Sequence, residues 1–123
     1  MSCHIGDSSF LIARLRKNNF ELFFMSKDQY HNFNFPYQVG RKLDTIDKFI
    51  FEEYDLCNKD IVILATDGLW DNLQIKTILQ TVNILKDKKT NLIDTQKLSE
   101  VLSKKSQIMS FNKYVFIIIL EKK

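Results

Sequence analysis

The fold is indicated by the run Asp60-Ile-Val-Ile-Leu-Ala-Thr-Asp67-Gly68-Leu69-Trp70-Asp71-Asn72 in the middle of the chain. Its apolar part predicts a buried β-strand that carries Asp67 at its carboxyl end, and Gly68 then allows a sharp turn. Asp71 follows where helical periodicity begins, so both carboxylates are expected to project from the rim of a sheet toward one point. Oxygen ligands of this kind suit hard divalent cations such as Mg²⁺ or Mn²⁺.

Each aspartate also has a purely structural explanation. Asp71 would be favoured in the first turn of a helix by the macrodipole, and Asp67 can close a turn with Gly68. A second motif weighs against this explanation. Near the start of the chain stands His4-Ile-Gly6-Asp7-Ser-Ser-Phe-Leu-Ile12, in which a Gly-Asp pair again interrupts an apolar stretch. The sequence therefore offers two acidic turns next to predicted strands.

Together the two motifs resemble the metal-dependent protein phosphatases of type 2C. In that family a Gly-Asp-Ser element lies at a strand turn, and a later apolar strand is followed by Ala-Thr-Asp-Gly-Leu-Trp-Asp-Asn or a close variant. Between the two motifs, His31-Asn-Phe-Asn-Phe-Pro-Tyr-Gln38 resembles the branch of the family related to mitochondrial matrix phosphatases. Three matches in the same order identify the family more strongly than any one of them.

The hydrophobic pattern predicts an α+β fold. We expect strands at 2–5, 9–15, 20–25, 49–54, 60–66 and 114–120. The strands at 49–54 and 60–66 are expected to pair with each other, and the last strand to be central and buried. Residues 26–44 are interpreted as a loop or a short helical excursion. One helix is expected at about 70–85, and a second is expected to be capped by Thr90 or Asn91, with Asp94 in its first turn. The resemblance implies that these elements are part of a four-layer α-β-β-α sandwich.

The resemblance also implies the chemistry of the site. In the family, a pair of metal ions activates a water molecule that attacks phosphoserine or phosphothreonine directly. Carried over to this chain, Asp67 is a ligand of the central metal pair, and Asp7 and Asp71 help to hold a third, weaker ion. Gly68 lets the backbone pass close by. The implied cofactor is Mg²⁺ or Mn²⁺ and the implied substrate is a phosphoprotein. No side chain is assigned as a catalytic acid, base or nucleophile.

Parts of the family pattern are missing from this chain. The family domain is considerably longer, and its front half carries an acidic pair, an Asp-Gly element and a basic residue that grips phosphate. Before the last strand the family has Asp-Asp or Asp-Asn, whereas this chain has Asn112 and Lys113, and a lysine opposes cation binding by like charge. We therefore expect residues 1–123 to be the carboxyl-terminal part of a type 2C domain, with little or no activity alone. The missing amino-terminal half or another subunit would then be a partner.

Two alternatives follow from these departures. The chain can be a non-catalytic pseudophosphatase, a phosphoprotein-binding regulatory module of the same fold, and the residues at 112 and 113 favour that reading. A phosphotransferase of the haloacid dehalogenase type also places an aspartate after a strand. That family needs a second carboxylate two residues later, where this chain has Leu69.

Composition narrows the classes of protein to which the chain can belong. The chain of 123 residues is 45% hydrophobic, which allows one domain or part of one with a real core. The net charge of +3 forms no basic stripe, so nucleic-acid binding is not expected. Cys3 and Cys57 fit neither a disulfide framework nor a zinc spacing, which suits an intracellular location, mitochondrial or cytoplasmic. No signal peptide is visible, and the apolar run 114–120 is too short to span a membrane.

Overall fold

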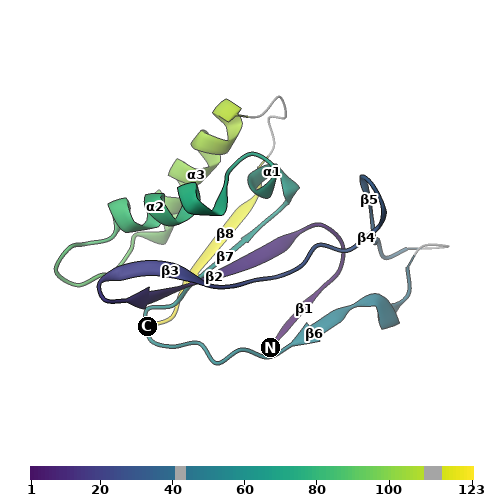
Figure 1. Ribbon diagram of the computed structural model, residues 1–123, viewed down its shortest axis with the longest axis horizontal. Coiled ribbons are helices and arrows are strands. Elements are labelled where there is room, and N and C mark those ends of the chain that lie inside the picture. Colours follow the sequence, from purple (N-terminus) through teal and green to yellow (C-terminus); the bar gives the residue numbers. More distant parts are fainter. Residues whose placement is uncertain (41–43, 110–114) are drawn as a thin grey trace.

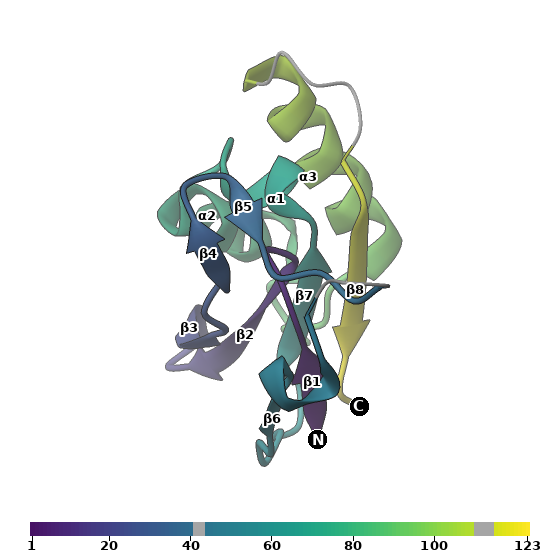
Figure 2. The same ribbon diagram turned by 90° about the vertical axis from the view of Figure 1, so that its right-hand side faces the viewer.

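The computed structural model describes residues 1–40, 44–109 and 115–123. Its centre is a four-stranded antiparallel sheet in the order β3-β2-β7-β8. These strands are β2 (Ser9–Arg16), β3 (Asn19–Met25), β7 (Ile61–Ala65) and β8 (Ile117–Glu121). Helices α2 (Ile75–Leu85) and α3 (Thr95–Met109) lie along one face of this sheet (Figure 1). A ribbon of β1 (Ser2–His4) and β6 (Ile50–Glu52) lies on the other side (Figure 2).

The β2–β3 hairpin is confirmed, and its turn explains its register. Lys17 and Asn18 have φ angles of 45° and 69°, the left-handed pair of a type I′ turn. This turn matches the twist of the flanking strands and sets the pairing of Leu15 with Phe20. A shift of register between Ile12 and Ala13 then pairs Leu11 with Met25. The hairpin therefore returns the chain to the start of β2 shortly after residue 25.

The core lies between the sheet and the two helices. Along β7 the side chains alternate, with Ile61, Ile63 and Ala65 buried in the core while Val62 and Leu64 are on the opposite face. The helices contribute residues at helical spacing, which confirms the predicted periodicity of both segments. The buried cluster comprises Leu11, Ala13, Phe20, Ile61, Ile63, Ala65, Leu69, Leu73, Ile78, Val82, Ile93, Leu98, Leu102 and Ile119.

The predicted pairing of the strands at 49–54 and 60–66 is wrong. β6 pairs with β1, whereas β7 lies between β2 and β8. An alternating pattern shows that a strand is half-buried but carries no information about its partner. The last strand is also an edge strand of its sheet rather than a central one, with Ile118 44% and Leu120 57% exposed. Residue 114, its predicted start, lies outside the described residues.

The predicted helix at about 70–85 is two helices. α1 spans Asp67–Trp70, and α2 begins only at Ile75. Leu69 in α1 and Leu73 within the break are both buried, so the apolar spacing continues through the break and conceals it. The cap of α3 is Asp94, whose Oδ1 accepts the Lys97 N–H at 3.0 Å; the predicted caps further upstream are wrong.

The segment predicted as a loop contains a small hairpin. Its strands are β4 (Tyr30–Asn32) and β5 (Phe35–Pro36), and the 3₁₀ turn η1 (Ile46–Lys48) follows. Asn34 sits between the two strands with a φ angle of 53°, a conformation that asparagine tolerates. Such short strands carry too few residues to show a period.

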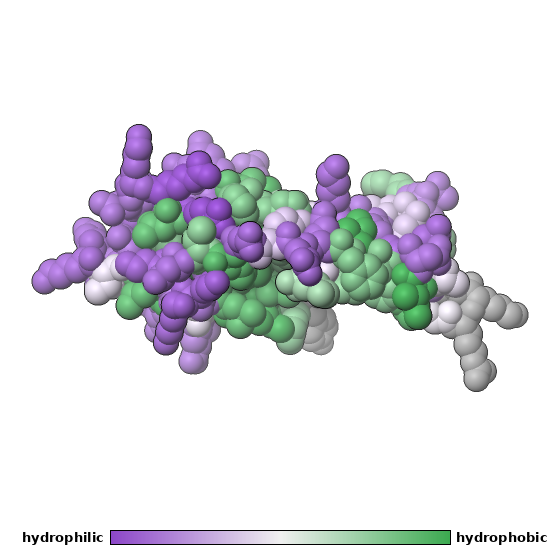
Figure 3. Space-filling view, turned by 90° about the horizontal axis from the view of Figure 1, so that it is seen from below, coloured by the Kyte–Doolittle hydropathy of each residue, from purple (hydrophilic) through white to green (hydrophobic). Residues whose placement is uncertain are grey.

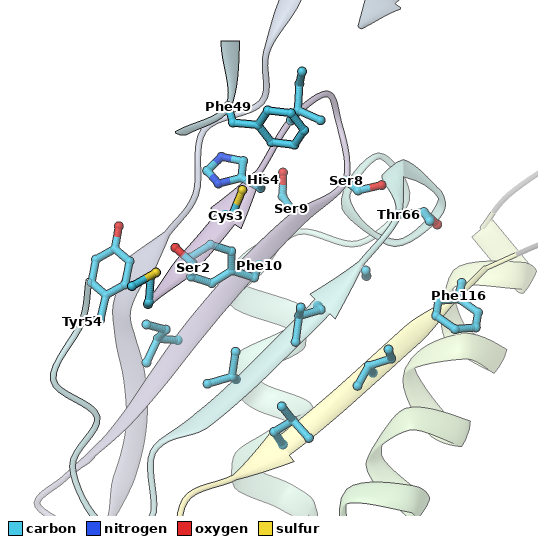
Figure 4. A pocket seen from close by; sticks show the side chains of 18 of the residues that line it. Ser2, Cys3, His4, Ser8, Ser9, Phe10, Phe49, Tyr54, Thr66 and Phe116 are labelled. Carbon is cyan, nitrogen blue, oxygen red and sulfur yellow. The ribbon is translucent and has the colours of Figure 1, made fainter. Parts of the chain in front are cut away.

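One face of the main sheet is left partly open. Between this face and the β1–β6 ribbon lies a hollow of about 620 Å³, lined mainly by apolar side chains (Figure 4). Seen from the side opposite to the helices, hydrophobic residues gather along the middle of the surface (Figure 3). Of the four layers expected, the described residues therefore form one helical layer and a four-stranded sheet, with the β1–β6 ribbon on the other side.

No helix in the described ranges has the length and apolar character needed to cross a membrane.

Candidate metal centre

The two acidic turns meet because β2 and β7 are antiparallel neighbours. Ser9, at the start of β2, pairs with Ala65, at the end of β7. Asp7 and Asp67 therefore emerge at the same end of these two strands, which we call the acidic edge. The turn before β2 requires Gly6, which has a φ of 88° and would bring a Cβ to 2.8 Å from the carbonyl oxygen of Tyr37. This register brings together the two acidic turns that the sequence motifs predicted.

The turn after β7 is held by hydrogen bonds from its own residues. The Gly68 N–H donates to Asp67 Oδ1 and the Asp71 N–H to the Asp67 carbonyl oxygen, both at 2.8 Å. Trp70 Nε1 donates to the carbonyl oxygen of Ala65 at 2.9 Å, which folds α1 back against the end of β7. The result is a single turn that carries Asp67 at its start and Asp71 at its end.

The carboxylates at this edge act on one another. Partial burial raises the pKa of Asp71, and the negative charges of Asp67, Asp28 and Asp7 raise it further. The pKa of Tyr30 is likewise raised, first by burial and then by the same group of four aspartates. Asp7, Asp28, Asp67 and Asp71 are therefore near enough to one another for their negative charges to interact.

Asp28 is the member that sequence analysis missed. Its Oδ1 accepts a hydrogen bond from Ser9 Oγ, and the Gln29 N–H donates to the Gly6 carbonyl oxygen at 2.9 Å. These bonds fix the segment after β3 against the Gly6–Asp7 turn. The signal was present in the predicted hairpin, because a return of β3 antiparallel to β2 places the residues after 25 beside the start of β2.

Gly68 shapes the turn without offering a free ligand atom. Its carbonyl oxygen accepts a hydrogen bond from Ser106 Oγ at 2.5 Å and another from Asn72 Nδ2 at 2.9 Å. A carbonyl oxygen has two lone pairs, and both are used within the protein. The Gly68 carbonyl is thus hydrogen-bonded to helix α3, and the close backbone passage expected at this glycine stays a prediction.

The two histidines have partners outside the group of four aspartates. His31 Nε2 bonds to Asp44 at 2.9 Å, and its ring lies 4.2 Å from that of Tyr37. The Gln38 N–H and His31 together hold the pKa of Asp44 below its usual range, against the opposing effect of burial. His4 lines the hollow under the sheet, edge-on to Phe10. Asn112 and Lys113 lie outside the described residues.

The residues present fit part of a cation site. Their carboxylate oxygens are the donors that Mg²⁺ and Mn²⁺ prefer, and their mutual repulsion is of the kind that a cation relieves. Within residues 1–40, 44–109 and 115–123, however, no group of three or more His, Cys, Asp or Glu side chains is arranged to hold an ion. The described residues therefore do not form a closed metal site, and the role of these carboxylates as metal ligands stays a prediction.

Comparison with known proteins identifies the family. No protein-family model matched the chain. The protein phosphatase PTC7 homolog of Danio rerio is 31% identical over 120 residues, which cover 90% of this chain and 38% of that protein. The probable protein phosphatase 2C BIPP2C1 of Oryza sativa subsp. japonica is 35% identical over 82 residues, covering 67% of this chain and 14% of that protein. The chain belongs to the type 2C protein phosphatase family.

Further similarities place this type 2C phosphatase chain near the PTC7 branch. The PTC7 homolog fig of Drosophila simulans is 35% identical over 96 residues, covering 71% of this chain and 29% of that protein. The X-ray structure of the photosystem II phosphatase PBCP superposes with a TM-score of 0.61 at 21% identity, over 83% of this chain and 38% of that one. The fold is thus α+β of the type 2C kind, and the chain spans 29% to 38% of the length of the two PTC7 homologues.

Proposed function

We propose that this chain contributes to metal-dependent hydrolysis of phosphoserine or phosphothreonine in proteins. The observation that supports it is that the register of β2 and β7 brings the turn with Asp7 beside the turn with Asp67 and Asp71, while Asp28 is hydrogen-bonded to Ser9 at the start of β2. Repulsive carboxylates cost stability unless a cation joins them. Their place at the end of β7, in a chain of the type 2C family, favours Mg²⁺ or Mn²⁺ as that cation.

In this proposal Asp67 holds the central cations, and Asp7 and Asp71 hold a further, weaker one. Bound divalent cations supply a nucleophilic water near neutral pH and neutralise the charge of the phosphate. The chain's own contribution is to fix the carboxylates. The Gly6 turn carries Asp7, α1 carries Asp67 and Asp71, and Asp28 ties the first turn to the end of β3 through Ser9.

We further propose that residues 1–123 form the carboxyl-terminal part of a type 2C domain, and that the rest of the domain covers the open face. The chain spans only a fraction of its relatives' length, and the described residues do not complete a metal site. The apolar hollow would be filled by a second sheet packed face to face, as in other β-sandwiches. That segment would be supplied by a longer form of this protein or by another subunit.

The test measures Mn²⁺-dependent release of phosphate from a phosphothreonine peptide. Residues 1–123 alone are expected to release little or none. The same residues mixed with, or fused to, the portion of the Danio rerio homologue outside the matched segment are expected to be active. Asp67→Asn in that assembly should lower activity by at least about 100-fold, the scale on which loss of a metal-site residue acts. An assembly that binds through this chain and hydrolyses equally well with Asp67→Asn would refute the role of Asp67.

The second candidate is a pseudophosphatase, a phosphoprotein-binding or regulatory module of the same fold. The absence of a complete ligand group among the described residues favours it. In that case the assembly would bind the phosphopeptide without releasing phosphate, and its affinity would not depend on Mn²⁺. The same experiment, read by fluorescence anisotropy of a labelled peptide, separates the two functions.

Either function has a phosphoprotein as its partner and needs neither nucleic acid nor a membrane. We propose an intracellular location, mitochondrial or cytoplasmic, since the relatives include PTC7 homologues and both cysteines are free thiols. Fractionation of cells that express the full-length gene, followed by protease protection of intact mitochondria, would distinguish the two compartments.

A further inference from the structure

Helix α3 buries a polar residue where its pattern calls for an apolar one. Leu98, Leu102 and Ser106 follow one another at intervals of four, and all three are 0% exposed. Such spacing places the three side chains on the same side of the helix, toward the core. A hydroxyl buried there costs free energy unless it is hydrogen-bonded. The position therefore requires an explanation beyond packing.

The hydrogen-bond partner of Ser106 lies in the acidic turn that follows β7. Its Oγ donates to the carbonyl oxygen of Gly68 at 2.5 Å, between Asp67 and Asp71. Helix α1 is only four residues long, so its few internal hydrogen bonds cannot fix its position. Contacts from the rest of the molecule must do so. Leu69, fully buried, provides the apolar contact, and Ser106 provides a directional one from an element 38 residues further along the chain.

We propose that Ser106 is a positioning residue for the metal-binding carboxylates, setting where Asp67 and Asp71 point without touching the cation itself. The inference rests on the proposed function, since it concerns the same edge. Partners that orient ligands control metal affinity although they lie outside the coordination sphere. With the hydroxyl removed, the Gly68 carbonyl keeps only its bond from Asn72, within the same turn. The turn can then shift relative to α3.

The experiment compares Ser106→Thr with Ser106→Val. Threonine and valine have the same shape, and only threonine keeps the hydroxyl, so the pair cancels the effect of added volume. Mn²⁺ binding to the chain is followed by electron paramagnetic resonance. We expect the threonine variant to bind Mn²⁺ like the wild type and the valine variant about tenfold more weakly. Amide hydrogen exchange at Asp71 without metal should be faster in the valine variant only.

The matched control is Thr81→Val in helix α2. Thr81 is also buried, at 2% exposure, and its hydroxyl bonds to Thr77 in its own helix and to Lys105, neither of which belongs to the turn from Asp67 to Asp71. Its loss should lower the melting temperature without changing Mn²⁺ affinity. Equal Mn²⁺ affinity in the two Ser106 variants would overturn the inference and leave the proposed function standing. A wild-type chain that binds no Mn²⁺, alone or assembled, would overturn both.

Discussion

At the residue scale, burial and charge repulsion at Asp71 should lower the stability of the folded protein. Its pKa is raised by burial and by Asp67, Asp28 and Asp7, so its charged form is disfavoured in the folded state. Asp71→Asn removes that charge and should increase the free energy of unfolding in metal-free buffer at pH 7. Because the side chain is largely exposed, the gain is expected to be only about 0.5 kcal/mol. Urea denaturation in the presence of a chelator measures it.

The direction of the pKa shift of Asp71 determines how the stability gain of Asp71→Asn depends on pH. A carboxyl group whose folded pKa is raised binds its proton more tightly in the folded state, so its destabilising effect is full above that pKa. The advantage of Asp71→Asn should therefore shrink as the pH falls through the raised value toward 3.8. Asp87→Asn is the matched control, because hydrogen bonds from Thr90 and Lys89 lower the pKa of Asp87. That variant should be less stable than the wild type at pH 7, and the same sign for both variants would contradict the argument.

At the scale of the element, Asn83 joins helix α2 to the edge of the sheet. Its Oδ1 accepts the Phe20 N–H at 2.7 Å, and its Nδ2 donates to the Phe20 carbonyl oxygen at 2.9 Å. The amide thus takes the place of a neighbouring strand beside β3. Asn83→Ala leaves both backbone groups without this partner and should cost about 2 kcal/mol. Thermal unfolding followed by circular dichroism measures the loss.

A suitable control for this prediction is Gln80→Ala, an exposed position on the same helix. Substitution at such a site is expected to change stability by less than about 0.5 kcal/mol. Similar unfolding of the two variants would mean that water replaces the Asn83 amide at no cost, and that the contact does not hold the edge strand.

The elements also show how far sequence reasoning reaches. The hairpin, the strand that precedes Asp67 and the apolar faces of the helices follow from local patterns, and all were predicted. The pairing of β6 with β1 was not, because alternation specifies a face and never a partner. The break between α1 and α2 was hidden since Leu69 and Leu73 maintain the apolar spacing across it.

The residues of the candidate site also fall into two groups, those that a sequence motif indicates and those that only the structure reveals. Asp7, Asp67 and Asp71 stand in motifs and could be proposed as site residues from the sequence alone. Asp28 and Ser106 stand in no motif and join the site only through hydrogen bonds to Ser9 and Gly68. Contacts of this kind depend on the register of a hairpin and on the rotation of a helix, which periodicity fixes too loosely to predict a bond.

At the scale of the whole molecule, the open face of the sheet is the feature that remains to be explained. Ile118 and Leu120 of β8 are 44% and 57% exposed, while Ile119 between them is buried in the core. Large exposed apolar patches mark surfaces that are covered by another part of an assembly. A protein that kept this face bare would be prone to association, since the hollow on this face is lined mainly by apolar side chains.

The double variant Ile118→Thr with Leu120→Thr tests this conclusion. Threonine favours strands, and both side chains point away from the core, so the melting temperature should change by only a few degrees. Binding of the dye ANS and self-association in sedimentation should both fall, as should binding of the complementary segment of the Danio rerio homologue. Ile119→Thr, which alters the core instead, should destabilise the fold by about 2 kcal/mol. If the double variant still binds the complementary segment with unchanged affinity, the rest of the domain packs elsewhere and the open face has another role.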